Sequence, residues 1–346
     1  MKAMIGMSGG VDSSVAAFLT QRSGAECVGA IMRLHDGGGT QDVADAQAVA
    51  KRMGMDFHVL DFSEDFRRAV MDHFAACYLQ GLTPNPCVVC NRHLKFGRFL
   101  ESAQALGCDT VVTGHYARVK KLENGRYRLE KAVDEAKDQT YFLYALTQDQ
   151  LSHIRLPLGE LTKQQVRQIA QEQGFLNAKK RDSQDICFIP DGDYLAFLQR
   201  HTGIAPQPGQ FLDEGGRVVG THRGAAGYTL GQRKGVGLAM GAPVYVCGKD
   251  MASNTVTVGP NESLFCTTLL AEDWIFSAID APLAPIRCQA KTRSRMAQQP
   301  ATLYPEENGI YRLVFDEPQR AITPGQAVVL YDGNIVLGGG TITKVP

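Results

Sequence analysis

The chain has 346 residues, and its 36 Lys and Arg balance 36 Asp and Glu, so the formal net charge at pH 7 is zero. That balance argues against a histone-like or polybasic binder, although basic residues can still gather on one face. With 44% hydrophobic and 21% charged residues, the composition is that of a globular chain with a substantial core, which excludes disordered, collagen and coiled-coil proteins. The length predicts about two domains, or three small ones.

Nine cysteines occur with irregular spacing along the chain. In a chain of this size the pattern indicates reduced thiols rather than a secreted disulfide framework. The start of the sequence lacks the long apolar stretch of a signal peptide, and no run of roughly eighteen apolar residues is present. We therefore expect a cytoplasmic protein that does not associate with a membrane.

The first two hundred residues alternate β-rich runs with helical patterns. Strands are expected at 3–7, 27–34, 57–62 and 110–113, and helices at 11–22 and 42–53, in a longer region that ends near 80, and from about 90 to 106. Such alternation predicts a parallel, doubly wound α/β sheet. Asn124-Gly125, between runs at 117–122 and 127–131, predicts a hairpin that lies outside this sheet.

After about residue 203 the texture changes, because glycines recur and the runs become short and β-like. Many short strands between turn signals are typical of a small barrel or sandwich. The boundaries we expect are an α/β domain at 1–203, a Gly-rich β connector at 204–260 and an all-β domain at 261–346.

A Ser-Gly-Gly-Val-Asp-Ser-Ser segment at 8–14 stands between the first expected strand and helix. Glycines there let the backbone approach an anion, and the helix start supplies unpaired N–H groups. Ser13 and Ser14 add hydroxyl donors, and Asp12 could help to hold Mg²⁺. A plain helix cap with a glycine turn is the alternative, but the length of the match favours a phosphate loop. It is neither a Walker A loop nor a dinucleotide fingerprint.

Three cysteines lie in polar or basic surroundings. Cys87 and Cys90 belong to a Pro/Asn loop with a helix expected to begin near Cys90, which would lower the pKa of that thiol. Cys187 follows a basic trio at 179–181, although its apolar neighbours alone would make it a core residue. A lone C-x-x-C is a weak sign of zinc. The other six have apolar neighbours and are expected to be inert and at least partly buried: Cys27, Cys77, Cys108, Cys247, Cys266 and Cys288.

The segment at 8–14 resembles the signature of the PP-loop ATP pyrophosphatases, which bind ATP there and adenylate a substrate oxygen. Further blocks extend the resemblance to the bacterial tRNA-specific 2-thiouridylase family within that superfamily. They lie at 6–14, 83–96, 113–116, 137–143, 182–189, 229–237, 291–293, 323–326 and 338–340. They span nearly the whole chain. The fold this implies is a PP-loop α/β domain, a small β connector and a C-terminal β-barrel that contacts tRNA.

The resemblance implies 2-thiolation of the wobble uridine in the anticodon stem-loop of tRNA. ATP, with Mg²⁺, would adenylate the C2 oxygen, and sulfur carried as a persulfide would then displace AMP. By position Cys187 matches the persulfide carrier and Cys90 the catalytic cysteine, which can form a disulfide with it during turnover. A sulfur-relay protein or a cysteine desulfurase would supply the sulfur.

The same resemblance assigns binding residues. Those matching nucleotide-binding positions are Gly6, Met7, Ser8, Gly9, Gly10, Val11, Asp12, Ser13, Met32 and Gly114. Those matching the target-base loop are Asn85, Pro86 and Cys87, and those matching tRNA contacts are His115, Lys137, Asp138, Gln139, Arg293, Ser294 and Gln326. Short basic segments at 179–181, 233–234 and 291–295 are either solvated loop charge or contacts with tRNA phosphates.

Cys87 departs from the family pattern, which has an aspartate there. Together with Cys90 and Cys187 it would give three thiolates and an open position, a set that suits a [4Fe–4S] cluster. A drifted residue in an ordinary persulfide enzyme is the equal alternative. A PP-loop ligase acting on a small metabolite, and a nonenzymatic tRNA-binding or iron–sulfur sensing protein, are the competing functional classes.

Overall fold

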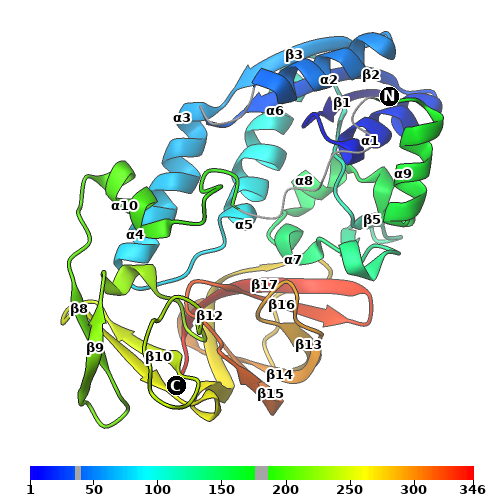
Figure 1. The fold of residues 1–346 in the computed structure, drawn as a ribbon. Coiled ribbons are helices and arrows are strands. Elements are labelled where there is room, and N and C mark those ends of the chain that lie inside the picture. The colour runs from blue at the N-terminus through cyan, green and yellow to red at the C-terminus, as the bar shows by residue number, and fades with distance from the viewer. Residues whose placement is uncertain (36–39, 176–185) are drawn as a thin grey trace.

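A computed structural model describes residues 1–35, 40–175 and 186–346. It begins with a five-stranded sheet in the order β3-β2-β1-β4-β7 (Figure 1). Every pair of neighbouring strands in it is parallel. The strands are β1 (Lys2–Gly6), β2 (Glu26–Arg33), β3 (Asp56–Asp61), β4 (Thr110–Val112) and β7 (Ile154–Arg155). The expected doubly wound α/β fold is confirmed, and only the short β7 was not predicted.

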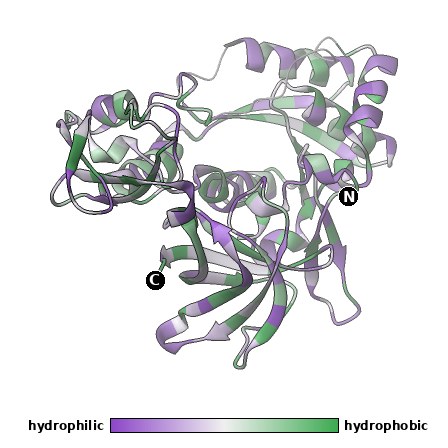
Figure 2. Ribbon diagram, turned by 60° about the horizontal axis from the view of Figure 1, so that its bottom comes forward, coloured by the Kyte–Doolittle hydropathy of each residue, from purple (hydrophilic) through white to green (hydrophobic). Residues whose placement is uncertain are grey.

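Helices cover both faces of this sheet because the side chains of β1 alternate between two cores. Ala3 and Ile5 pack with Val15 of α1 (Val11–Arg22), α2 (Thr40–Arg52) and α9 (Lys163–Glu172). Met4 points the other way and joins the cluster that contains Phe99 of α6 (Phe99–Ala105). In Figure 2 hydrophobic and hydrophilic residues are interspersed along both the strands and the helices. No helix in the described ranges is long and apolar enough to cross a membrane.

The two longer helical regions contain π-helical segments, which the sequence did not predict. The first runs through α3 (Ser63–Phe66), the π-segment Arg67–Asp72 and α4 (His73–Leu79). The second runs through α5 (Pro86–Cys90), the π-segment Asn91–Arg98 and α6. Pro86 occupies the first turn of α5, where its missing N–H costs nothing. The helix expected to begin near Cys90 therefore begins earlier, and Cys90 ends its first segment.

A β-rich region follows α10 (Tyr194–Thr202), which ends at Gly203 in a left-handed conformation with φ 74°. Its sheet has the order β10-β11-β8-β9. The strands are β8 (Gly209–Leu212), β9 (Val218–His222), β10 (Tyr245–Asp250) and β11 (Thr255–Gly259). Phe211, Val246 and Val256 form its small core, so this region packs around a centre of its own.

The C-terminal strands close into a barrel, as the resemblance implied. The order β12-β15-β14-β13-β16-β17 returns to its start because β17 also pairs with β12. The strands are β12 (Phe265–Phe276), β13 (Ile286–Lys291), β14 (Gln299–Pro305), β15 (Tyr311–Arg320), β16 (Ala327–Asp332) and β17 (Ile335–Lys344). A Cβ on Gly339 of β17 would lie 2.5 Å from the Tyr144 ring. This close approach requires glycine there.

The hairpin predicted around Asn124-Gly125 forms, with β5 (Arg118–Lys121) and β6 (Tyr127–Glu130). It lies outside the parallel sheet, as expected, and it extends the sheet of the barrel. Glu130 of β6 pairs with Ile335 of β17, and the Lys131 amide donates to the Asn334 carbonyl at 2.8 Å. The barrel is therefore joined by hydrogen bonds to the N-terminal part of the chain.

Tyr141 of α7 (Thr140–Leu143) makes a second connection to the barrel. Its hydroxyl lies 3.1 Å from the Thr292 carbonyl oxygen and 2.9 Å from that of Ala327. The side chain is almost fully buried. Because a buried carbonyl without a partner is costly, this hydroxyl stabilises the contact between the two parts.

Replacing Tyr141 by Phe removes only this hydroxyl and leaves both carbonyl oxygens without it. We expect the free energy of unfolding in urea to fall by about 1–3 kcal/mol. Tyr304→Phe, at a half-buried tyrosine of β14, is the matched control and should change it by less than about 0.5 kcal/mol. Equal effects of the two substitutions would contradict the assigned role.

Candidate functional site

The loop after β1 adopts the geometry of a phosphate-binding turn. Gly9 has φ +68°, and a Cβ there would lie 2.6 Å from the Asp42 carbonyl oxygen, so any side chain is excluded. Gly10 is the N-cap of α1 in an extended conformation, and no side chain in the described chain caps that helix. The first amides of α1 therefore keep the anion-binding character of a helix start.

Serine hydroxyls stabilise this loop from within. Ser13 Oγ accepts the Ser8 amide at 3.1 Å and donates to the Gly10 carbonyl at 3.0 Å. Ser14 Oγ also donates to the Gly10 carbonyl at 3.0 Å. The sequence analysis expected both hydroxyls to serve as anion donors. In the structure they are engaged in the turn itself, which leaves the backbone amides as the principal donors.

Asp12 is held by two residues from distant parts of the chain. The Lys163 ammonium lies 2.8 Å from both carboxylate oxygens, and the Tyr116 hydroxyl donates to Oδ1 at 2.9 Å. Lys163 is nearly buried at the start of α9. Lys163 is not among the site residues predicted from the sequence. The one local signal is the helix-capping Thr162 directly before it, and a helix cap does not indicate which residue Lys163 contacts.

The other residues expected to bind a nucleotide gather at the same edge of the sheet. Gly6 ends β1, Met32 lies near the end of β2 and Gly114 follows β4. A Cβ on Gly114 would lie 2.8 Å from the Ser13 amide nitrogen and from the Asp12 carbonyl carbon. Carboxyl ends of neighbouring parallel strands form the usual ligand site of such sheets. Met7 and Val11 are buried in the core beneath the loop.

Cys87, Cys90 and Cys187 come together at the start of the second helical region. Cys87 is exposed, Cys90 is buried as the last residue of α5, and Cys187 is exposed rather than in the core. Each thiol acts electrostatically on at least one of the other two. All nine cysteines are unpaired, and the six expected to be inert are buried or half-buried. The basic trio at 179–181 lies outside the described residues.

Burial governs the acidity of these thiols. It raises the pKa of Cys90 to about 11, and desolvation by the surrounding protein atoms raises the pKa of Cys87 and of Cys187 as well, although both side chains reach the surface. In each case the nearby Lys95 ammonium opposes the increase. The expectation that a helix start lowers the pKa of Cys90 is therefore wrong, because the residue lies inside the helical run and is desolvated.

The described residues hold no group of three or more His, Cys, Asp or Glu side chains placed to bind a metal ion. An iron–sulfur cluster needs thiolate sulfurs that converge on the metal. Cys87, Cys90 and Cys187 are close enough to interact, but they do not form such a set.

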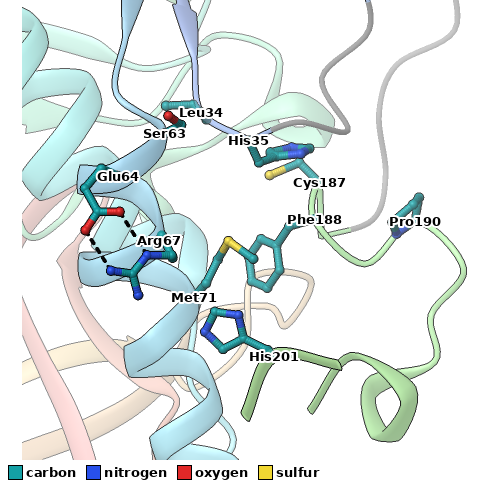
Figure 3. A pocket seen from close by; sticks show the side chains of 10 residues that line it. All are labelled: Leu34, His35, Ser63, Glu64, Arg67, Met71, Cys187, Phe188, Pro190 and His201. Atoms are coloured by element: carbon teal, nitrogen blue, oxygen red, sulfur yellow. Dashed lines mark hydrogen bonds and ion pairs between the residues drawn. The ribbon is translucent and has the colours of Figure 1, made fainter. Parts of the chain in front are cut away.

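Cys187 also faces a hollow of about 470 Å³ (Figure 3). Phe188 and Pro190 line the same side as Cys187, while Arg67 and Met71 line the opposite side. Arg67 is engaged by Glu64 at 2.7 Å. The hollow gives a small thiol-reactive group a route to Cys187 from solvent.

His115 contacts the edge of the thiol region, which consists of Cys87, Cys90, Cys187 and the π-segment Asn91–Arg98. Its Nδ1 lies 2.7 Å from Thr113 Oγ1, and its ring centroid is 5.6 Å from that of Phe96. Burial, and in second place the Lys95 charge, lowers the pKa of His115 to about 3. The imidazole is neutral at physiological pH and can accept or donate a hydrogen bond without carrying charge.

This chain is similar in sequence to known protein families along nearly its whole length. Models described as tRNA methyl transferase HUP domain, tRNA methyl transferase PRC-barrel domain and aminomethyltransferase beta-barrel domain match residues 1–191, 195–260 and 266–342. The tRNA-specific 2-thiouridylase MnmA of Clostridioides difficile is 47% identical, over 99% of this chain and 98% of its own length. That of Acetivibrio thermocellus is 46% identical over 99% of each chain. The chain belongs to the tRNA-specific 2-thiouridylase family.

Solved structures show more distant likenesses. A 4-thiouridine synthetase–RNA complex with bound ATP shares 16% identity, covering 58% of this chain and 50% of that one, with a TM-score of 0.37. The U34-tRNA thiolase NcsA from Methanococcus maripaludis, with its [4Fe–4S] cluster, shares 16%, covering 59% and 65%, with a TM-score of 0.34.

Several residues expected to contact tRNA form hydrogen bonds with backbone groups in the structure. Gln326 Nε2 donates to the Thr83 carbonyl at 2.7 Å, just before the expected target-base loop. Arg293 Nη2 donates to the Ala321 carbonyl at 2.9 Å. Gln139 Oε1 accepts the Tyr116 amide at 2.8 Å. Asp138 accepts from Thr140 and from the Ala132 amide. Asn85 stands at the N-cap position of α5 without a side-chain capping bond, and its side chain bonds to Tyr141. Pro86 is buried, and Lys137 and Ser294 are half-buried.

The Asp12–Lys163 pair predicts strong coupling between two distant segments of the 2-thiouridylase chain. In a double-mutant cycle of Asp12→Asn and Lys163→Met, urea unfolding should give a coupling free energy of about 1–2 kcal/mol. The exposed pair Arg98–Glu101 is the control and should give below about 0.5 kcal/mol. A coupling no larger than that of the control would contradict the assigned contact.

Proposed function

We propose that the chain is a tRNA uridine 2-sulfurtransferase that replaces the C2 oxygen of the wobble uridine by sulfur. One observation carries the proposal: an anion-binding turn and a group of three mutually interacting thiols occur in the same α/β domain. Activation of an oxygen and attack by sulfur need these two features. The high identity to 2-thiouridylases along the whole chain supports the same reading.

ATP is the activating substrate. The amides at the start of α1 would receive its phosphates, since Gly9 and Gly10 leave room for a close approach. Met32 and Gly114, at the ends of β2 and β4, would border the rest of the nucleotide. Lys163 would offset negative charge as pyrophosphate separates.

Mg²⁺ fits this site through Asp12, because carboxylate oxygens are its preferred protein ligands and phosphates supply the others. Among the described residues, Oδ1 of Asp12 accepts from Tyr116 and Lys163, and Oδ2 accepts from Lys163. Oδ2 therefore keeps a lone pair for the ion. The ion would neutralise phosphate charge during the transfer.

The proposed reaction has three steps. The uridine C2 oxygen attacks the α-phosphorus of ATP, and pyrophosphate leaves. The terminal sulfur of a Cys187 persulfide then attacks C2, and the C–O bond breaks to release AMP. Finally the Cys90 thiolate attacks Cys187 Sγ, which frees the thiouridine sulfur and leaves a Cys90–Cys187 disulfide. A dithiol reductant and a sulfur donor of the persulfide class, a relay protein or a cysteine desulfurase, restore the starting state.

Cys87 cannot supply the carboxylate that the family pattern has at its position. Burial raises the pKa of its thiol, so the group keeps its proton at neutral pH. We place it beside the target base as a neutral, weakly hydrogen-bonding side chain. His115, also neutral, is the nearby polar group that can orient the base.

We assign residues 1–203 to ATP binding and catalysis, 204–260 to the connector and 261–346 to contact with tRNA. Arg233, Lys234 and Arg295 are exposed on the latter two regions and would meet phosphates. With zero net charge, attraction for nonspecific RNA should be modest and recognition should depend on loop contacts. Nine unpaired cysteines suit the reducing cytoplasm, where we place the reaction.

Cys90→Ser and Cys187→Ser should each abolish 2-thiouridine formation in tRNA, measured by mass spectrometry of digested nucleosides. Both variants should still release pyrophosphate from ATP in a tRNA-dependent manner, because adenylation needs neither thiol. Cys266→Ser, at a half-buried cysteine of the barrel, is the control and should thiolate normally. Normal thiolation by both active-site variants would defeat the proposal. ATP–pyrophosphate exchange without tRNA would favour a small-metabolite ligase.

The persulfide route predicts that thiolation does not need iron. Protein purified without oxygen should contain no stoichiometric iron or acid-labile sulfide, and thiolation with a persulfide donor should survive iron chelation. Cys87→Ser should leave this activity within a few-fold of the parent. Stoichiometric iron, together with activity that chelation abolishes, would establish the cluster alternative instead.

A further inference from the structure

The thiol region contains a basic side chain that the proposed steps do not use. Lys95 lies in the π-helical segment Asn91–Arg98, five residues after Cys90. A π-turn joins residues i and i+5, so this geometry returns residue 95 to the side of the helix where Cys90 lies. Short π-helical segments often occur at functional sites.

Lys95 acts on four titratable groups of this region. Its charge influences Cys87 and Cys90 from α5, Cys187 from the segment that begins at 186, and His115 after β4. Among the described residues, Lys95 is the one cation whose charge affects all four of these groups. Attraction by Lys95 opposes the effect of burial on each thiol.

The other basic side chains of the π-segment are engaged elsewhere. Arg92 pairs with Asp273 at 3.1 Å, and Arg98 pairs with Asp65 and Glu101. In the parts of the chain that the structure describes, half-buried Lys95 has no hydrogen bond and no carboxylate partner. A lysine that only covered apolar surface would extend its ammonium to water. Here the charge of Lys95 acts to lower the pKa of three thiols.

We propose that Lys95 is a positioning residue that holds the anionic form of the reactive sulfurs against a fixed positive charge. The effect of Lys95 on the thiols is argued from the structure, whereas its use in sulfur transfer rests on the proposed function. A buried anion is costly unless a cation lies close to it. His115 cannot supply that cation because it is neutral, whereas the charge of Lys95 acts on both Cys90 and Cys187.

The substitution Lys95→Met removes the charge and keeps most of the side-chain volume, whereas Lys95→Arg keeps the charge. Lys51→Met, at an exposed lysine of α2, is the matched control. Each variant is treated with iodoacetamide across a range of pH, without ATP or tRNA, and the peptides that contain Cys90 and Cys187 are quantified by mass spectrometry. Circular dichroism and urea unfolding verify that each variant is folded.

We expect Lys95→Met to slow alkylation of Cys90 and Cys187 at neutral pH about tenfold or more, equivalent to one unit of thiol pKa. The pH at half-maximal rate should move upward, and Lys95→Arg should restore most of the parent profile. Lys51→Met should match the parent. With tRNA and ATP, Lys95→Met should lose 2-thiouridine formation while retaining tRNA-dependent pyrophosphate release.

An unchanged alkylation profile in a folded Lys95→Met protein would overturn the proposal. If that variant also lost affinity for tRNA, Lys95 would be a phosphate contact instead. Equal slowing by Lys95→Met and Lys95→Arg would likewise overturn it, because packing rather than charge would then matter. Alkylation needs no tRNA, so this result stands even if the parent protein fails to thiolate uridine.

Discussion

The backbone after β4 passes so close to the start of α1 that residue 114 has no room for a side chain. A Cβ there would lie 2.8 Å from the backbone of Asp12 and Ser13. This contact fixes the phosphate loop against the segment that carries His115, and His115 in turn packs on Phe96 of the π-segment. The phosphate loop, His115 and the π-segment are therefore linked by a chain of direct contacts.

Local features of the chain could be predicted from the sequence, because they depend on short-range rules. The Gly-Gly turn at 9–10, the alternation of strands and helices and the Asn124-Gly125 hairpin each follow from conformational preference and periodicity. The start of α5 differs from the loop predicted there, because Pro86 occupies the first turn of a helix.

Contacts between distant segments could not be predicted in this way. Asp12 and Lys163 are 151 positions apart, and nothing near either residue signals the other. The resemblance assigns tRNA contacts to Gln326 and Gln139. In the structure both side chains form hydrogen bonds with backbone groups of the chain itself. A polar side chain in a motif shows that its position matters without showing which partner it has.

The hairpin β5–β6 gives the domain boundaries a different meaning. Along the sequence the barrel begins after residue 260, but one strand of the α/β part is paired with β17. A fragment cut at that boundary would expose backbone groups of β17 that the full chain covers, and uncovered strand edges promote aggregation. The sheet of the barrel is thus extended by a hairpin that is synthesised long before the barrel strands.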